Sequence, residues 1–532
     1  MFAARQMPYH QTNSFSKIVL DYLEGDERLR SFYSLPPTLA GIEQAIEKKK
    51  QQGLDRTLLV NRLKEQYGAL DPGSRVRDNI EALLSENTFT ITTAHQPNLF
   101  TGPLYFIYKI VHAIKLADEL SRQLPLFRFV PVYYMGSEDA DFAELNHTYV
   151  DGKKIEWQKE QTGAVGRMIV DQTLVRLINE LEGQLYGREH SAGVIDLLRR
   201  CYMPGRNIQA ATFELVHELY ASYGLIVLIP DDAELKSRMK TVFSDDLFHH
   251  KPFEIVSAAS DRLSEHYEPQ AHAREINLFY LRENIRERIE RKNGRFEVVN
   301  TAYVFSDEEM RMELDRHPER FSPNVILRGL YQASILPDVA FIGGGGELAY
   351  WLQLKELFDH YHIVYPALVL RNSFLIVEEK WQELMTRIGL DVESVFQDEN
   401  SLMRLIVEKH STNAVSLNGN FEKADALFEQ IKTQAGAIDP TLLQHVAAIK
   451  ARSLKSLQEL EKKMLRAEKR KFGYQQHQLS KLKEALFPRG GLQERVENFS
   501  SFHASWGSRF IDELYRHAPS LEQRFTILEW AQ

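Results

Sequence analysis

The stretch between residues 89 and 116 most constrains the fold, because its pattern changes from that of a strand to that of a helix across one turn. Residues 89–93 are β-branched or aromatic, as in a buried strand, and residues 94–103 form a polar segment with two prolines. In residues 104–116, apolar side chains recur at a spacing of three and four, which is typical of a helix that rests on a sheet. The stretch therefore predicts a strand, a turn and a helix.

The turn carries polar groups that suit an anion. His95 and Asn98 lie just before the predicted helix, and Pro103 suits its first position. The free N–H groups at a helix N-terminus attract negative charge, so an imidazole and an amide beside them can hold a phosphate or a carboxylate. Thr101 and Gly102 of the same turn are candidate substrate contacts. A solvated turn whose histidine has no function is the alternative.

Four further segments have the composition of buried strands, and helical segments separate them along the chain. They are residues 127–135, 225–229, 339–342 and 363–370. Strands that alternate with helical crossovers predict a parallel sheet. The expected fold class is therefore α/β, with a doubly wound parallel sheet.

A chain of 532 residues exceeds what one hydrophobic core normally organises, so two or three domains are expected. We expect a core over residues 1–375 that begins with charged helices and contains insertions at about 148–207 and 233–322. The second insertion has the pattern of a charged helical tract with one strand-like excursion at residues 296–300. A final helical segment, residues 488–532, is expected to pack back on the core.

Residues 376–487 have the pattern of a helical coiled-coil domain. Apolar residues from Val446 to Ala467 recur every three or four positions among lysines and glutamates, and Asp439-Pro440 marks a corner between antiparallel helices. Such a seam can bind a second copy and give a homodimer, or it can fold against the shorter helix at residues 421–431 of its own chain. Both arrangements stay open at this stage.

Three carboxylates follow the second predicted strand. Glu138, Asp139 and Asp141 would lie at the carboxyl end of a parallel strand, where open α/β sheets bind their ligands. They can orient an amine, act as a general base or hold Mg²⁺. The alternative is a helix N-terminus that is rich in acids because the helix dipole favours them.

A run of four glycines links the strand at residues 339–342 to a helix. Gly343, Gly344, Gly345 and Gly346 permit positive φ angles and bring bare amides close to a ligand, so with Glu347 and Tyr350 they are candidate nucleotide-binding residues. The run is not a Walker loop, because the glycines are contiguous and no Lys-Ser/Thr follows. A merely flexible loop is the alternative.

Two further segments offer groups that can hold carboxylates. Arg328 and Gln332 lie four residues apart on the helix predicted before Pro337, so one face of that helix can present both. Arg371 and Asn372 directly follow the last predicted strand. Arginine pairs with carboxylates through two parallel hydrogen bonds, which suits a diacid substrate.

The composition excludes several classes of function. No apolar run approaches the ~18 residues of a membrane span, and a formal net charge of −9 argues against nonspecific nucleic-acid binding. Cys201 is the only cysteine, which excludes disulfides and a zinc site of several thiolates and fits a reducing cytoplasm. The N-terminus lacks the apolar stretch of a secretory signal.

Three blocks of sequence resemble the bacillithiol-biosynthesis cysteine-adding enzymes. These blocks are residues 93–109, 130–142 and 343–352. The resemblance implies a Rossmann-like core of the nucleotidyltransferase and class I synthetase type with connecting-peptide insertions, and a coiled coil that mediates dimerisation. It also implies a ligase that joins the carboxylate of cysteine to the amine of glucosaminyl malate, with ATP or another nucleotide activating the acid and Mg²⁺ as a possible partner of that nucleotide.

The chain departs from the motifs of that superfamily at three places. Asn98 stands where a His-x-Gly-His signature has its second histidine, and Glu347 or Tyr350 would replace the acid of a Gly-Gly-x-Asp loop. No Lys-Met-Ser-Lys-Ser loop follows the last predicted strand, where only Arg371 offers a cation. A nucleotidyltransferase for another small acid, and a non-catalytic scaffold with a degenerate pocket, are therefore the alternative functions.

Overall fold

A five-stranded parallel sheet forms the centre of the computed structural model, which describes residues 2–68, 70–411 and 416–530. Its strand order is β13-β12-β2-β3-β6, and all four neighbouring pairs are parallel. The strands are β2 (Thr88–His95), β3 (Arg128–Met135), β6 (Ile226–Leu228), β12 (Asp338–Gly343) and β13 (Ala367–Leu370). The five predicted strands and the α/β class are confirmed. The last strand begins only after Pro366, which cannot donate to a neighbouring strand.

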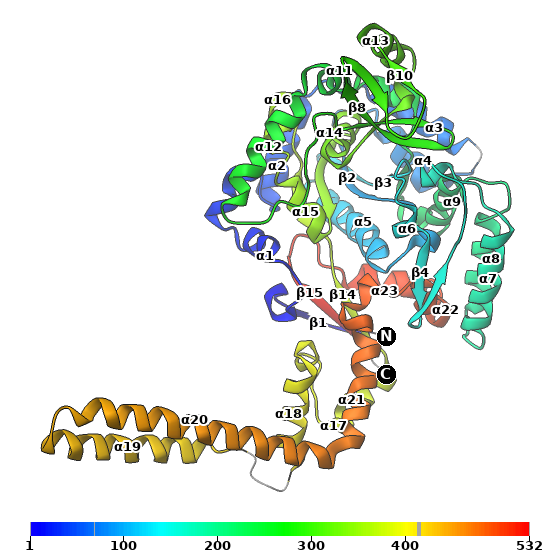
Figure 1. Ribbon diagram of the computed structural model, residues 1–532. Coiled ribbons are helices and arrows are strands. Elements are labelled where there is room, and N and C mark those ends of the chain that lie inside the picture. Colours follow the sequence, from blue (N-terminus) through cyan, green and yellow to red (C-terminus); the bar gives the residue numbers. More distant parts are fainter. Residues whose placement is uncertain (1, 69, 412–415, 531–532) are drawn as a thin grey trace. The chain divides into compact units, whose positions relative to one another are not determined.

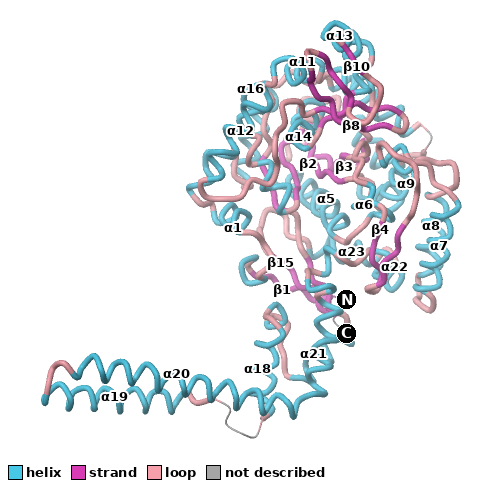
Figure 2. The backbone as a smooth tube through the Cα atoms, viewed as in Figure 1, coloured by secondary structure: helices cyan, strands magenta, loops and turns pink. Residues whose placement is uncertain are grey.

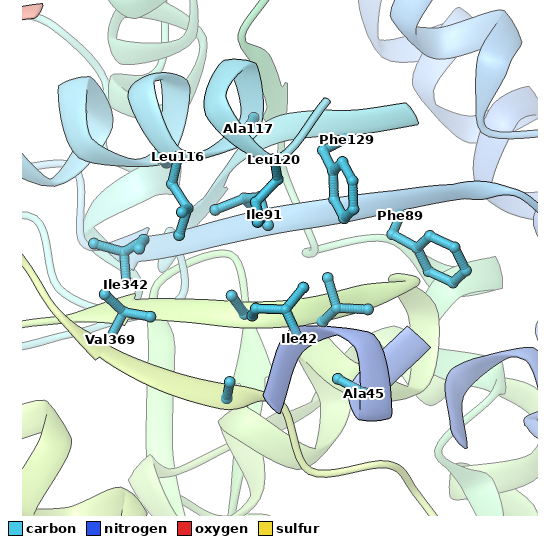
Figure 3. Packing of buried hydrophobic residues seen from close by; sticks show 14 of the residues in the cluster. Ile42, Ala45, Phe89, Ile91, Leu116, Ala117, Leu120, Phe129, Ile342 and Val369 are labelled. Atoms are coloured by element: carbon cyan, nitrogen blue, oxygen red, sulfur yellow. The ribbon is translucent and has the colours of Figure 1, made fainter. Parts of the chain in front are cut away.

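Two helices cover this sheet through one apolar cluster (Figure 3). Helix α5 (Tyr105–Gln123) places Leu116 and Leu120 against Ile91 of β2, and α2 (Leu39–Gln51) adds Ile42. All four side chains are buried, and full burial of one such side chain stabilises a fold by about 1.5–3 kcal/mol. The predicted strand, turn and helix between residues 89 and 116 therefore form the centre of the core.

The larger insertion is a sheet and not a helical tract with a single strand. Its five antiparallel strands have the order β10-β9-β8-β7-β11. They are β7 (Leu278–Arg282), β8 (Ile285–Lys292), β9 (Arg295–Val298), β10 (Val304–Phe305) and β11 (Phe321–Pro323). The prediction missed most of them because β8 is rich in charge, yet its Arg286 and Arg291 cover the rings of Phe279 and Phe296. The smaller insertion carries the hairpin of β4 (His147–Val150) and β5 (Lys153–Glu156).

Both ends of the chain contribute strands where helices were predicted. A three-stranded sheet has the order β1-β15-β14, formed by β1 (Phe2–Met7), β15 (Phe525–Trp530) and β14 (Phe374–Val377). The helical expectation for residues 1–88 and 488–532 is therefore wrong at their outer ends. Isolated short strands carry a weak local signal, since pairing with distant segments determines their structure.

The chain divides into two compact units. The first holds Met1–His10, Ser14–Leu375 and Gly491–Leu528, and the second holds Gln11–Asn13, Ile376–Gly490 and Glu529–Gln532. The helices of the first unit are distributed around its sheets (Figure 1). Besides α2 and α5 they are α1 (Lys17–Glu24), α3 (Arg56–Tyr67), α4 (Gly73–Ala82), α6 (Phe142–Leu145), α7 (Gln172–Leu185), α8 (Ser191–Cys201), α9 (Ile208–Tyr220), α10 (Ala233–Ser237), α11 (Lys240–His249), α12 (Lys251–Ser264), α13 (Asp307–Arg316), α14 (Val325–Ile335), α15 (Gly345–Trp351), α16 (Lys355–His360), α22 (Phe499–Trp506) and α23 (Arg509–His517).

The second unit is dominated by a long helical hairpin (Figure 2). Helices α19 (Asn418–Ile438) and α20 (Leu442–Lys469) turn at the predicted Asp439-Pro440 corner and pair with each other. Lys450 of α20 forms ion pairs with Asp425 and Glu429 of α19 at 2.7 and 2.6 Å. The long helix therefore pairs with a helix of its own chain, which is longer than the predicted residues 421–431. The other helices of this unit are α17 (Glu379–Ile388), α18 (Glu399–His410) and α21 (Gly473–Leu486).

No helix in the described ranges is both long enough and apolar enough to cross a membrane.

Candidate functional site

The first unit contains a cavity of about 820 Å³ at the carboxyl ends of its parallel strands. Segments that follow β2, β3, β12 and β13 all reach it, as expected for an open α/β sheet. The inserted sheet and residues near 495 complete its wall. The lining residues are Ala94, His95, Gln96, Tyr105, Lys109, Gly136, Asp139, Glu144, Gln270, Phe279, Arg286, Asn324, Val325, Arg328, Gly344, Gly345, Gly346, Glu347, Tyr350, Arg371 and Arg495.

His95 ends strand β2 and lines the cavity. Its ring lies against Tyr105 and Phe106, with centroids 5.3 and 5.6 Å away. Among the described residues its buried Nε2 has no hydrogen-bond partner, which is rare for a buried polar atom. Burial and the positive charges of Lys109 and Arg371 hold the pKa of His95 well below its usual range. The imidazole is therefore neutral at physiological pH, and a ligand can satisfy its free nitrogen.

Lys109 connects the end of strand β2 to the helix that the glycine run begins. Its Nζ donates to the carbonyl of Ala94 at 2.8 Å and forms an ion pair with Glu347. Glu347 in turn accepts a hydrogen bond from the N–H of Gly344 at 2.8 Å. Burial lowers the pKa of Lys109, and the charge of Glu347 opposes that shift. One buried ammonium group thus connects the end of β2 to the first turn of α15, although sequence reasoning did not select it.

The glycine run begins helix α15 and does not use positive φ angles. Gly344 has φ −74° and ψ 171°, and none of the four glycines is in the left-handed region, so that part of the expectation is wrong. A Cβ atom added at Gly346 would meet nothing within 4 Å, whereas one at Gly345 would lie 3.2 Å from Val19. Gly344, Gly345 and Gly346 all line the cavity. Gly343 lies in β12, and its carbonyl accepts from the N–H of Arg371.

The three predicted carboxylates have three different environments. Asp139 lines the cavity and accepts from Arg328 at 3.2 Å and from Gln96 at 3.3 Å. Burial would raise its pKa, but Arg328 and Arg286 outweigh that effect and lower it, so Asp139 is ionised. Glu138 pairs instead with the buried Lys236, outside the cavity lining. Asp141 is exposed and caps α6.

Arg328 and Gln332 occupy one helix but serve different parts of the structure. Arg328 reaches the cavity from α14, whereas Gln332 donates to Asp338 at 3.1 Å inside the core. The side chain of Asp338 also binds Lys49 at 3.0 Å, and both of these side chains are fully buried. Gln332 is therefore not part of the cavity wall.

Arg371 reaches the cavity, but its guanidinium already forms an ion pair with a carboxylate of the protein. Its guanidinium lies 2.7 Å from Glu494 and 5.4 Å from the ring centre of Tyr105. Asn372 turns away and donates to the carbonyl of Pro519 at 2.9 Å.

Asn98, Thr101 and Gly102 form a buried turn behind His95 and do not line the cavity. The side chain of Asn498 holds this turn by donating to the carbonyls of Phe100 at 2.8 Å and Gly102 at 2.6 Å. Thr101 has a φ of 72°, a conformation that the Asn498 contacts stabilise.

Several lining residues were missed by sequence reasoning, namely Tyr105, Lys109, Glu144, Arg286 and Arg495. Lys109 could have been noticed, because it stands between Tyr108 and Ile110 in a run of buried residues of helix α5. Arg286 and Arg495 had no such signal, since each lies in a segment rich in charge. In the described ranges, no group of three His, Cys, Asp or Glu side chains could hold a metal ion.

Comparison with known proteins connects this architecture to a family. The model described as "Bacillithiol biosynthesis BshC, N-terminal Rossmann-like domain" matches residues 2–372. The model described as "Bacillithiol biosynthesis BshC, C-terminal coiled-coil domain" matches residues 374–530. The chain belongs to the bacillithiol biosynthesis BshC family. The resemblance seen in the three sequence blocks is thereby confirmed, together with the Rossmann-like and coiled-coil domains.

Relatives in the BshC family match the chain almost end to end. Each of the following is named "Putative cysteine ligase BshC". The protein from Flavobacterium johnsoniae is 38% identical over 522 residues, 98% of both chains. The protein from Cytophaga hutchinsonii is 38% identical over 516 residues, 97% of both chains. That from Salinibacter ruber is 30% identical over 544 residues, covering 97% of this chain and 96% of its own.

Proposed function

We propose that this protein is the cysteine ligase of bacillithiol synthesis, which joins the carboxylate of cysteine to the amine of glucosaminyl malate. One observation carries the proposal: a single cavity gathers a neutral imidazole, an ionised carboxylate, several guanidinium groups and bare glycine backbone. These are the groups needed to hold an acid, an amine and a nucleotide together. The name carried by the family relatives supports the same activity.

The cavity wall fits a nucleotide on two counts. Within the described part of the chain the buried Nε2 of His95 lacks a hydrogen-bond partner, and the backbone at Gly346 leaves room that a side chain would fill. In the proposed site, Gly344 to Gly346 and Tyr350 contact the nucleotide, while Lys109 and Glu347 hold that loop in place. When bound, ATP or another nucleotide supplies the free energy that makes a carboxylate reactive toward an amine.

Two cavity carboxylates suit different tasks toward the amine. Asp139 stays ionised beside Arg328 and can orient an ammonium group. Burial and the charges of Asp139 and Asp141 raise the pKa of Glu144 above its ordinary value. A more basic carboxylate is the better proton acceptor, so we assign to Glu144 the removal of a proton from the attacking amine.

The direct test uses the purified full-length protein with cysteine, glucosaminyl malate and ATP. We expect mass spectrometry to detect the thiol amide product together with AMP or ADP. Absence of product with every nucleotide tried would defeat the ligase proposal. Pyrophosphate exchange promoted by an unrelated acid would favour a nucleotidyltransferase instead.

Replacing Gly346 by Ala tests the role of the glycine run. The added methyl group meets no protein atom, and alanine is a better helix former by about 1 kcal/mol, so stability should not fall. The methyl group projects toward the proposed nucleotide, so the KM for ATP should rise by about 10-fold, the equivalent of roughly 1.4 kcal/mol. Steady-state kinetics measures this change. Gly183→Ala in α7, another helical glycine with open space around it, is the control and should leave KM unchanged.

We also propose that the second unit forms a homodimer. The hairpin leaves large apolar side chains exposed, including Leu427, Ile438 and Leu460 at 54%, 82% and 48%. A second copy would cover them, and light scattering of the full-length protein measures the resulting mass.

A further inference from the structure

Arg286 lines the cavity although it belongs to the inserted sheet and not to the Rossmann-like core. Its Nε donates to the hydroxyl of Ser322 on β11 at 3.1 Å, and its guanidinium lies 4.0 Å from the ring centre of Phe279 on β7. Two neighbouring strands thus fix the plane of the guanidinium that β8 supplies. These contacts use the Nε–H group and one face of the guanidinium plane. Both terminal amino groups of the side chain are left to bind a ligand.

Arg286 has no carboxylate partner in an ion pair within the described residues. Three other cations of the cavity have carboxylate partners: Lys109 binds Glu347, Arg328 binds Asp139 and Arg371 binds Glu494. Arg495 is exposed to water. Arg286 is partly buried and forms no ion pair with any described residue. Burial lowers its pKa to about 10 even though Asp139 acts in the opposite direction.

Arg286 and Arg328 both act on the same carboxylate. Each lowers the pKa of Asp139, and Arg328 bonds to it directly. Arg286, unlike Arg328, forms no hydrogen bond with that carboxylate among the described residues. A partly buried charge without a partner is costly, so the arrangement favours a ligand that brings the missing negative charge.

We infer that Arg286, together with Arg328, forms the subsite that recognises an oxyanion of the substrate and so helps determine specificity. A carboxylate or phosphate group would be held by the terminal amino groups of Arg286, since a planar guanidinium matches two oxygens at once. This inference rests on the proposed function for the identity of the anion. Two sources share this chemistry, the malyl carboxylates and the phosphates of the nucleotide.

The test measures binding without turnover, by titration calorimetry of the full-length protein with glucosaminyl malate and, separately, with ATP. Arg286→Gln should weaken the binding of one of them by 10- to 100-fold, within the range that a lost charged hydrogen bond allows. Arg286→Lys should recover only part of the loss, because an ammonium group lacks the planar fork. Arg288→Gln is the control, since that arginine is 41% exposed on the same strand and pairs with Glu290.

The pattern of losses identifies the anion. Weaker binding of glucosaminyl malate alone assigns the subsite to a carboxylate, and weaker binding of ATP alone assigns it to a phosphate. Unchanged binding of both ligands in Arg286→Gln, or no binding of either by the unaltered protein, would overturn the inference. Because no product is measured, loss of binding in a protein that fails to ligate would support the subsite while defeating the ligase. Thermal melting of both variants checks that they fold.

Discussion

Lys49→Met should lower the free energy of unfolding of the first unit by about 3–5 kcal/mol, the range found when one partner of a buried ion pair is removed. Lys49 donates to Asp338 at 3.0 Å and to the carbonyl of Ala333 at 2.8 Å, and both ionic side chains are fully buried. Burial lowers the pKa of Lys49, which Asp338 opposes. Without the ammonium group, the buried carboxyl group of Asp338 has only the side chain of Gln332 as a side-chain donor among the described residues, and its burial is no longer compensated.

Urea unfolding followed by tryptophan fluorescence measures this loss. The double variant Lys49→Met, Asp338→Asn should recover most of the stability, because no charge stays buried and an amide oxygen can still accept from Gln332. Lys48→Met is the matched control, since that neighbour is exposed and should change stability by less than about 0.5 kcal/mol. Equal stabilities of Lys49→Met and Lys48→Met would refute the prediction.

His95→Ala should lower the rate of product formation by about 100-fold or more, as expected for loss of a hydrogen bond or proton transfer in the transition state. The imidazole lines the cavity and its Nε2 has no partner among the described residues, so we expect that atom to bind a reacting group. His95→Gln should retain more activity than His95→Asn, because only the longer amide reaches the position of Nε2. Single-turnover kinetics separates this effect from substrate binding.

The pH dependence provides an independent check on His95. Because its pKa lies well below the usual value, the neutral form persists between about pH 6 and pH 8, and protonation removes it only in more acidic solution. We therefore expect no histidine inflection near neutral pH in kcat/KM. An inflection near pH 6.5 that disappears in His95→Gln would contradict this assignment. His272→Gln, at an exposed histidine, should leave the profile unchanged.

The sheet and the position of its ligand-binding edge could be predicted from the sequence because their signals are local. The strands of the parallel sheet are rich in β-branched, aromatic and other apolar residues, and the segments after β2, β3, β12 and β13 begin with Gln96, Gly136, Gly344 and Arg371. Those segments meet in the cavity because parallel strands point the same way. His95, Asp139, Arg328 and Gly344, which were selected from the sequence, all line this cavity.

The ion pairs that decide which side chains face the cavity could not be predicted in this way. Glu138 and Asp139 are neighbours in sequence, yet Lys236 holds one outside the cavity wall while Arg328 holds the other in it. From the sequence, Arg371 was expected to be a cation available to a ligand, whereas in the structure it pairs with Glu494. These partners are distant in sequence, and no local pattern connects them. The place of Arg286 in the cavity wall could not be predicted for a related reason, since the sequence of its strand has the charge content of an exposed helix.

The contacts of Asn498 and Glu494 have a consequence for synthesis of the chain. Asn498 fixes the turn behind His95, and Glu494 fixes Arg371, so the wall built from earlier parts of the sequence depends on residues near the end. All five strands of the parallel sheet precede these two residues in the chain, so during synthesis on the ribosome the cavity wall is completed only after the sheet. A fragment that stops at Gly490 would therefore keep a sheet and lose an ordered site.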